Sequence, residues 1–446
     1  MLWKKIFPLF FLYAIVDGFV SNLLFPAKMP LLYKDFLLIF VYFIFIMNEN
    51  VRHNLAELRY WMGTTVWHFG MAFMFLAILQ IFNPTSPGLV LGLLGFKVLF
   101  LYWPLALLGY AYITNLDSLL KFLTIIVIAS VPVNIFGLFQ FVKGPEFVTR
   151  FGAGFERAIF MADIEGYTGP AIKSFFRVIG TFASTGQYSS FIVVSIMSCF
   201  ALIFSFSTPA KRWVYYGCQL LNFLSLLASG SRGWLLTLLV QLIVLGMSVR
   251  RIRPVLAATF VAGLSLYGGF SWLGKAVIKR YESIGEIQML KMRSVGMTGG
   301  MLLSYLDRYP MGKGLGAGST ASRHLAENDP MLGWTLIENY PAKLQMETGI
   351  VGVVLFYAFS IALIFRLRRW LTLMHGKIYD ITMALASHCL VHFSIVSLFN
   401  LLDIAPTAVF LWTMLGFVAK LSVLSISEQS AERGGAPGDL YAPRLI

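Results

Sequence analysis

The residue that most strongly suggests chemistry in this sequence is Arg232, in the run Leu227-Ala-Ser-Gly-Ser-Arg-Gly-Trp-Leu235 between two apolar segments. No other charged residue lies nearby, and small residues flank it on both sides. A guanidinium can present two N–H groups to a pair of phosphate oxygens, so Arg232 is a candidate for holding a phosphate or pyrophosphate. The alternative is an arginine that extends from the bilayer to the membrane surface.

A second set of candidates lies in the polar interval from about Lys275 to Lys343. Arg293 belongs to a segment that can form a helix on the membrane surface, where the arginine either contacts a ligand or faces solvent. Arg308 is a further candidate for substrate binding, with solvation as its alternative. A long polar loop between two hydrophobic segments is where a membrane protein can act on a polar substrate, so we expect the active site here.

The end of this interval carries a carboxylate, Glu338, followed by Asn339 and Tyr340. A carboxylate beside an acceptor hydroxyl can act as a general base, and Glu338 is the candidate for that role. Asn339 and Tyr340 are candidates for substrate binding. Glu347 is either a further binding residue or an acidic residue in the first turn of a helix, where the helix dipole favours it.

An earlier polar segment runs from Arg177 through small and hydroxyl residues to Gln187, at the start of an apolar run. Such residues at a helix N-terminus can bind an anion through free backbone N–H groups. Helix capping explains Ser184 and Thr185 equally well, so both interpretations stay open.

The other reactive residue types do not indicate a metal or cofactor site. The glycines of the run 311–318 do not follow a predicted strand, and Lys313 lacks the Ser or Thr that ends a nucleotide-binding loop. His388 and His392 have a spacing that can bind a metal, but no third ligand is near in sequence, so hydrogen bonding between helices is favoured. The cysteines lie in apolar runs without metal spacing. We therefore expect neither a metal nor an organic cofactor.

The elements that must position these residues are membrane helices. Of the 446 residues, 58% are hydrophobic and only 13% are charged, which excludes an ordinary soluble domain. A bilayer core of about 30 Å needs roughly 20 apolar residues per helix, so the sequence predicts an all-α polytopic membrane protein with about twelve transmembrane helices. The predicted spans are 6–25, 32–47, 65–82, 89–112, 119–141, 187–206, 214–229, 233–250, 254–274, 347–366, 379–399 and 404–425.

The predicted organisation is a single transmembrane domain over residues 1–426. Its long outer loops, about 142–186 and 275–346, are expected to form the active site, and the second of them, between the ninth and tenth helices, is expected to contain short helices. Residues 427–446 are small and polar and are predicted to form a disordered cytoplasmic tail. Asp17 and Lys97 lie inside spans, where they are expected to pair internally or to reach a polar cavity.

The distribution of Lys and Arg predicts the orientation, because short cytoplasmic loops carry an excess of basic residues. With the N-terminus inside, the short outer flanks hold only Lys28, Lys34 and Arg232. Both termini are therefore predicted to be cytoplasmic. The predicted cytoplasmic flanks hold Lys4, Lys5, Arg52, Arg59, Lys121, Lys211, Arg212, Arg250, Arg251, Arg253, Arg366, Arg368, Arg369 and Lys377.

The net charge of +14 is spread over the span ends, which favours membrane lipids or an anionic lipid-linked substrate over nucleic acid as binding partners.

Taken together, these motifs resemble the bacterial O-antigen ligase and O-antigen polymerase superfamily. The similarity runs from about Arg177 to Phe356 and depends on the order of the motifs and on their placement between spans. The motifs are Arg177-x-x-Gly-Thr-Phe182, Gly230-Ser-Arg-Gly233, Arg293, Tyr309-Pro-Met-Gly-Lys-Gly-Leu-Gly316, and Asn339 followed by Leu344, Glu347-Thr-Gly349 and Gly352.

The resemblance implies a glycosyltransferase of the bacterial inner membrane that takes a glycan from undecaprenyl pyrophosphate without a metal. Arg232 and Arg293, with Arg177, would hold the pyrophosphate. Ligases of the family carry a His immediately before the Asn of the last motif, whereas this chain has Glu338 there. This difference favours a polymerase that joins lipid-linked repeat units into a surface polysaccharide, with a chain-length regulator and a repeat-unit flippase as expected partners. The alternatives are ligation of the glycan to a lipid or protein acceptor and, in another class, transport of a lipid-linked oligosaccharide.

Overall fold

The computed structural model describes most of the chain. The described residues are 2–24, 33–86, 88–152, 154–155, 176–206, 208–249, 252–253, 255–257, 259–260, 263, 300–319, 337, 339–394, 402 and 405–432. They fold into α-helices, and no strand occurs among them, which confirms the predicted all-α fold. The helices are α1 (Leu2–Leu24), α2 (Tyr33–Asn48), α3 (Val51–Met62), α4 (Thr64–Ile81), α5 (Leu89–Phe100), α6 (Leu105–Tyr112), α7 (Leu116–Lys143), α8 (Pro145–Thr149), α10 (Thr185–Ser205), α11 (Pro209–Ser229), α12 (Arg232–Ser248), α16 (Met301–Arg308), α18 (Tyr340–Thr372), α19 (Gly376–Ser394) and α20 (Ala405–Glu432).

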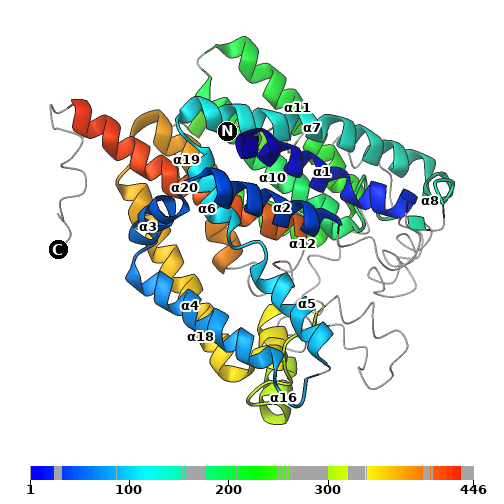
Figure 1. Cartoon of the computed structure of the whole chain (residues 1–446). Helices are drawn as coiled ribbons and strands as arrows, with labels where there is room; N and C mark the ends of the chain where they lie inside the picture. The colour runs from blue at the N-terminus through cyan, green and yellow to red at the C-terminus, as the bar shows by residue number, and fades with distance from the viewer. Residues whose placement is uncertain are drawn as a thin grey trace.

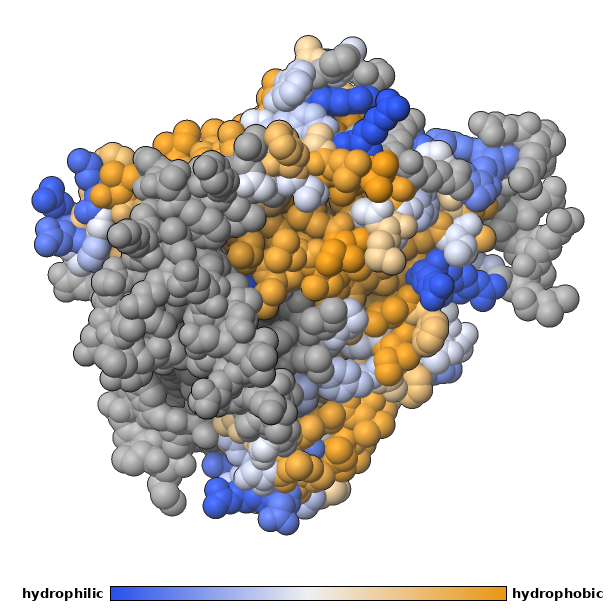
Figure 2. Space-filling view, turned by 180° about the vertical axis from the view of Figure 1, so that it is seen from behind, coloured by the Kyte–Doolittle hydropathy of each residue, from blue (hydrophilic) through white to orange (hydrophobic). Residues whose placement is uncertain are grey.

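The outer surface of these helices is hydrophobic, as lipid contact requires. Among the described residues, seven helices, counting α5 and α6 as one, are long and apolar enough to cross a membrane. Large apolar side chains are exposed along several helices, for example Phe75 on α4, Met247 on α12 and Phe365 on α18. Figure 2 shows a broad hydrophobic surface with hydrophilic residues gathered at its margins. Since an apolar surface of this extent is unfavourable in water, the chain is a helical membrane protein.

The helices agree with the predicted spans in position, with a few differences. Helices occupy all the predicted ranges except the ninth, 254–274, which lies mostly outside the described residues, so the number of twelve crossings stays a prediction. α18 begins at Tyr340, before the predicted start at 347, and α20 continues to Glu432, into the segment predicted to be a disordered tail. α3 was not predicted, because its sequence is too polar for a span.

The described turns that carry candidate residues are tied by hydrogen bonds to the ends of α1 and α4. There, Phe19 donates through its backbone N–H to the Thr181 carbonyl at 2.7 Å, and Asn83 Nδ2 donates to the Gly312 carbonyl at 3.3 Å. The first turn of α1 and the second half of α20 lie near α3, where Trp3 Nε1 donates to Glu49 at 3.1 Å and Lys420 Nζ lies 3.8 Å from Glu57 Oε2. Figure 1 shows α4 and α18 side by side in a limb that extends away from the main bundle, with α16 at its tip.

α20 crosses α6 with the two backbones in direct contact at glycines. A Cβ atom added at Gly416 would overlap the carbonyl oxygen of Ala106, and one added at Gly109 would lie 2.6 Å from the carbonyl oxygen of Thr413. Small residues let membrane helices approach this closely, and van der Waals packing then holds them together. The contact therefore fixes the position of α20.

We expect Gly416→Ala to destabilise the detergent-solubilised protein by about 1–3 kcal/mol, the usual effect of overpacking. Gly217→Ala is the matched control, because Gly217 is also helical and nothing lies within 4 Å of where its Cβ would be. That control should be at least as stable as the parent, since alanine favours a helix. Thermal unfolding of both variants measures the difference, and equal stability would contradict the α6–α20 contact.

Candidate functional site

Arg232 is the first residue of α12, and only 8% of it is exposed. The chain reverses just before it at Gly230, whose φ of 64° lies in the left-handed region that glycine adopts without strain. The Ser189 hydroxyl donates to the Ser229 hydroxyl at 3.0 Å, which ties this turn to the start of α10. Protein therefore encloses the guanidinium, which argues against an arginine extended over the membrane surface.

Arg177 lies just before a second turn at the same end, and its side chain is half-buried. Gln140 of α7 holds this turn by exchanging two hydrogen bonds of 2.9 Å with the backbone of Gly180. The Thr181 hydroxyl donates to the Ile15 carbonyl of α1 at 2.7 Å. Ser184 then caps α10 by accepting from the next turn, so capping accounts for this residue without an anion.

The glycine run 311–318 forms a loop packed tightly between α4, α5 and α18. Gly312, Gly314 and Gly316 have positive φ values, and a Cβ atom at Gly316 would overlap the carbonyl oxygen of Leu91. Gln80 of α4 donates from Nε2 to the Met311 carbonyl at 2.8 Å and accepts from the Leu315 N–H through its backbone carbonyl at 3.1 Å. The glycines are needed here for backbone conformation and close approach, as glycine alone allows.

The run packs into a break in α18 at Gly349, whose φ of 69° and ψ of −176° are not helical. The backbone N–H of Ile350 donates to the Pro310 carbonyl at 3.0 Å, and that of Lys313 donates to the Met346 carbonyl at 2.6 Å. α18 therefore consists of a short buried half-helix before the break and a long helix after it.

The half-helix carries a completely buried ion pair. Lys343 Nζ lies 3.6 Å from Glu347 Oε2, and neither side chain has any exposed surface. Glu347 Oε1 also accepts from the backbone N–H of Gly318 at 3.1 Å, which connects the pair to the glycine run. Because α18 starts at Tyr340, Glu347 lies two turns into the helix, and its interpretation as a first-turn acid is wrong.

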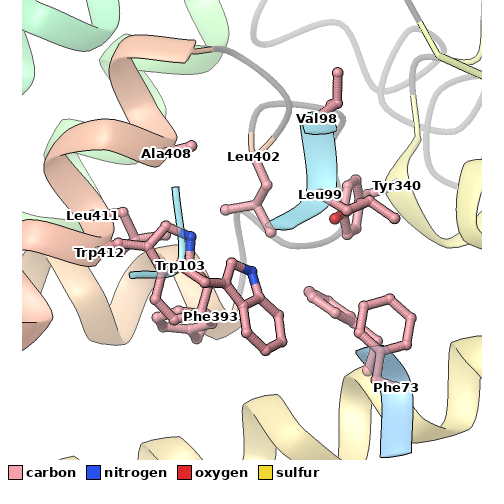
Figure 3. Close-up of a pocket in the computed structure, with 11 residues that line it drawn as sticks. Phe73, Val98, Leu99, Trp103, Tyr340, Phe393, Leu402, Ala408, Leu411 and Trp412 are labelled. Atoms are coloured by element: carbon pink, nitrogen blue, oxygen red, sulfur yellow. The ribbon is translucent and has the colours of Figure 1, made fainter. Parts of the chain in front are cut away.

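The start of the half-helix borders a cavity between the limb and the main bundle (Figure 3). Asn339 caps the helix by accepting from the Ala342 N–H at 2.6 Å, and the Tyr340 ring packs edge-on against Phe356. The cavity is small, with about 20 Å³ of free space, room for one or two water molecules. Tyr340 lines it on one side and Trp412 of α20 on the other, with apolar side chains filling most of the remaining wall. The surface next to Tyr340 is therefore mainly apolar.

The structure brings together only part of the predicted site. Arg177 and Arg232 lie near the start of α10, whereas Asn339, Tyr340 and Glu347 share the half-helix. Arg308, the last residue of α16, is exposed. The two remaining catalytic candidates, Arg293 and Glu338, lie outside the described residues.

Sequence reasoning missed the role of Lys343. A fully buried cation four residues before an acidic residue is a recognisable helix pair, so the spacing alone could have indicated it. Asp17 and Lys97 do pair internally, as predicted, but each pairs with α2. Lys34 Nζ lies 3.3 Å from Asp17 Oδ2, and Lys97 pairs with Asp35.

The two histidines of α19 take part in a contact between helices. Gln241 of α12 and His388 Nδ1 are 3.2 Å apart, which confirms the predicted hydrogen bond between helices, and His392 Nδ1 lies 2.7 Å from the His388 carbonyl. In the described part of the chain no group of three or more potential metal ligands occurs.

Comparison with known proteins gives no family for this chain. No protein-family model matches it, and no curated protein matches it.

Proposed function

We propose that this protein is a membrane glycosyltransferase that polymerises undecaprenyl-pyrophosphate-linked oligosaccharide repeat units into a surface polysaccharide on the periplasmic side. The observation that carries the proposal is the burial of Arg232 at the first position of α12. A guanidinium enclosed by protein acts in a low-dielectric setting, where it interacts more strongly with an anion than it would in water. The resemblance in the motifs implies that this anion is a pyrophosphate.

The apolar surface beside Tyr340 supports the lipid part of this proposal. It is mainly aromatic and aliphatic, as contact with a polyprenyl chain would require. It adjoins the half-helix of α18, which holds Asn339 at its start and the Lys343–Glu347 pair within it. The glycan would then lie toward the loop segments at this end.

In the proposed reaction, Glu338 accepts the proton of an acceptor hydroxyl on a second lipid-linked repeat unit. The acceptor oxygen forms a bond to the anomeric carbon of the donor glycan, and the bond from that carbon to the pyrophosphate oxygen breaks. Undecaprenyl pyrophosphate leaves with its negative charge held by Arg232 and Arg293, and Arg177 contributes to binding. Cations placed in advance where charge develops stabilise such a transition state.

Reconstitution in liposomes tests the proposal directly. With undecaprenyl-pyrophosphate-linked repeat units as the sole substrate and a metal chelator present, the protein should produce a ladder of polymer lengths on a gel. Single repeat units that stay unjoined, with correctly folded protein, would contradict polymerisation. Long chains formed without a terminal lipid or protein acceptor would also exclude a pure ligase.

A transporter of the same lipid-linked substrate is the second candidate, because of two observations. The pairs Asp17–Lys34 and Asp35–Lys97 place charges inside the helical bundle, and α18 is broken at Gly349, as helices in transporters often are. Cells that lack this protein distinguish the two functions. Repeat units that accumulate on the outer leaflet indicate a polymerase, whereas repeat units held on the inner leaflet indicate a transporter.

A further inference from the structure

Three arginines gather at the corner between α3 and α4, on the side predicted to be cytoplasmic. Arg59 lies in the last turn of α3, and its guanidinium lies over the Trp67 ring of α4, 5.6 Å from the ring centre. Arg366 reaches the same corner from α18, because a Cβ atom at Gly63, the residue between α3 and α4, would lie 3.5 Å from its Nε. Arg369 follows three residues later on the same face of α18.

Arg366 holds this corner in place by binding the end of α3. One of its terminal nitrogens, Nη2, donates to the Tyr60 carbonyl at 3.0 Å, and its Nε donates to the Trp61 carbonyl. Trp370 Nε1 donates to the same Trp61 carbonyl at 3.0 Å. A cation is favourable at this position, because the last carbonyls of a helix carry partial negative charge. Direct contacts between α3 and α18 therefore fix the position of the corner.

The three arginines of the corner form no ion pair with any described residue. The lysines on the neighbouring helices differ in this respect. Lys4 Nζ lies 3.9 Å from Glu49 Oε1. Lys420 Nζ lies 3.8 Å from Glu57 Oε2. Since like charges held close together repel one another, an anion bound at the corner would be stabilising.

The residues around the corner are those of a membrane surface. Tyr60 is exposed and Trp67 is partly exposed, and both residue types gather at the level of the lipid headgroups. The face of α18 that carries Arg369 continues into the bilayer through Phe365 and Ile361, spaced four residues apart and 66% and 53% exposed. A lipid with its phosphate at the corner can therefore place an acyl chain on this apolar face.

The combination of charge and apolar surface restricts the class of ligand. Guanidinium groups bind pairs of phosphate oxygens, so the corner suits a phosphodiester. A nucleic acid or an acidic peptide would contact the charges and leave the apolar face uncovered. A zwitterionic lipid has a cation in its headgroup, which the arginines would repel. An anionic phospholipid satisfies both parts of the surface.

We infer that the corner formed by Arg59, Arg366 and Arg369 is a binding site for an anionic phospholipid of the bilayer. The phosphate lies against the guanidinium groups, and an acyl chain lies along α18. This inference does not depend on the proposed function, because the corner adjoins the second half of α20, whereas the turn before Arg232 is tied to the start of α10, next to the first turn of α20.

Native mass spectrometry of the detergent-solubilised protein tests the inference. The probe is phosphatidylglycerol, and phosphatidylcholine with the same acyl chains is the comparison lipid. The first phosphatidylglycerol molecule should bind about tenfold more tightly than the first phosphatidylcholine molecule. Arg59→Gln/Arg369→Gln should weaken the binding of phosphatidylglycerol roughly 30-fold, since each arginine near an anionic headgroup contributes about fivefold. Arg366 is left unchanged in this variant because it holds α3.

Arg368→Gln is the matched control. Arg368 is exposed and next to Arg369 in sequence, but it faces away from Arg366, because residues two apart in a helix differ in direction by about 200°. This variant should bind phosphatidylglycerol as the parent does. Thermal unfolding without lipid should be the same for the parent and both variants, since the substituted residues are exposed.

Three results would overturn the inference. They are equal binding of the two lipids by the parent, unchanged binding of phosphatidylglycerol by Arg59→Gln/Arg369→Gln, and an equal loss of binding in Arg368→Gln. A last comparison distinguishes a lipid from a soluble phosphate compound. Glycerophosphoglycerol, the same headgroup without acyl chains, should not displace phosphatidylglycerol at equal concentration, and displacement would also overturn the inference.

Discussion

Arg232→Ala is expected to abolish polymer formation, with a fall in rate of about 100- to 1000-fold, the effect of removing one preorganised charge-stabilising group. The reason is the position of Arg232, which is 8% exposed at the first residue of α12, so that in the proposed reaction its guanidinium would meet the departing pyrophosphate with little water between them. Arg232→Lys should keep a small part of the activity, because a lysine retains the charge but lacks the planar pair of donors. The measurement is the initial rate of polymer formation in membranes with equal amounts of protein.

Arg212→Ala is the control for this experiment. Arg212 is also a partly buried arginine and its Nε donates to the Phe206 carbonyl at 2.7 Å, but it lies at the opposite end of α11 from the Arg232 turn. Its loss should leave the polymer length unchanged. Polymer of normal length from a well-expressed Arg232→Ala protein would remove the proposed function.

Lys343→Met is expected to destabilise the protein by about 3–5 kcal/mol, because it leaves the Glu347 carboxylate buried without its cation. The double variant Lys343→Met/Glu347→Met removes both charges and should recover most of this loss, since replacing a whole buried pair by apolar residues is often neutral. The parent, the two single variants and the double variant are compared by thermal unfolding in detergent, which gives the coupling free energy between Lys343 and Glu347.

The activity of the double variant decides what the pair does. We expect it to regain polymerisation together with stability, because the pair holds the half-helix and the glycine run in place through Gly318. A stable but inactive double variant would contradict this purely structural role and would indicate that Glu347 takes part in substrate binding.

Much of the fold follows from local sequence, whereas most of the site does not. Long apolar runs determine the membrane helices, so helix positions such as those of α7 and α10 agree with the predicted spans. The start of α18 was misplaced because its half-helix is partly polar, and only tertiary contacts with the glycine run bury it. Composition alone does not reveal such contacts.

The partners of buried charges show the same limit. Lys343 and Glu347 are close in sequence and could have been paired from their spacing, but Lys97 meets Asp35 only because the end of α5 lies next to α2. The glycines at 312–316 could be recognised as a motif. The close contacts that require glycine there could not be predicted, since Gln80 and Leu91 are far away along the chain. Contacts between segments that are far apart along the chain determine the site, and these contacts cannot be predicted from a single sequence.

In the proposed polymerase, the backbone contact between α6 and α20 would bear on how long a product can grow. Because α20 is locked against α6 at Gly416, the apolar wall that Trp412 forms would keep its position from one sugar addition to the next. Every bond would then form at the same place, whatever length of chain has already been made. A fixed wall of this kind has no means of counting units, so a separate protein would have to decide when synthesis stops.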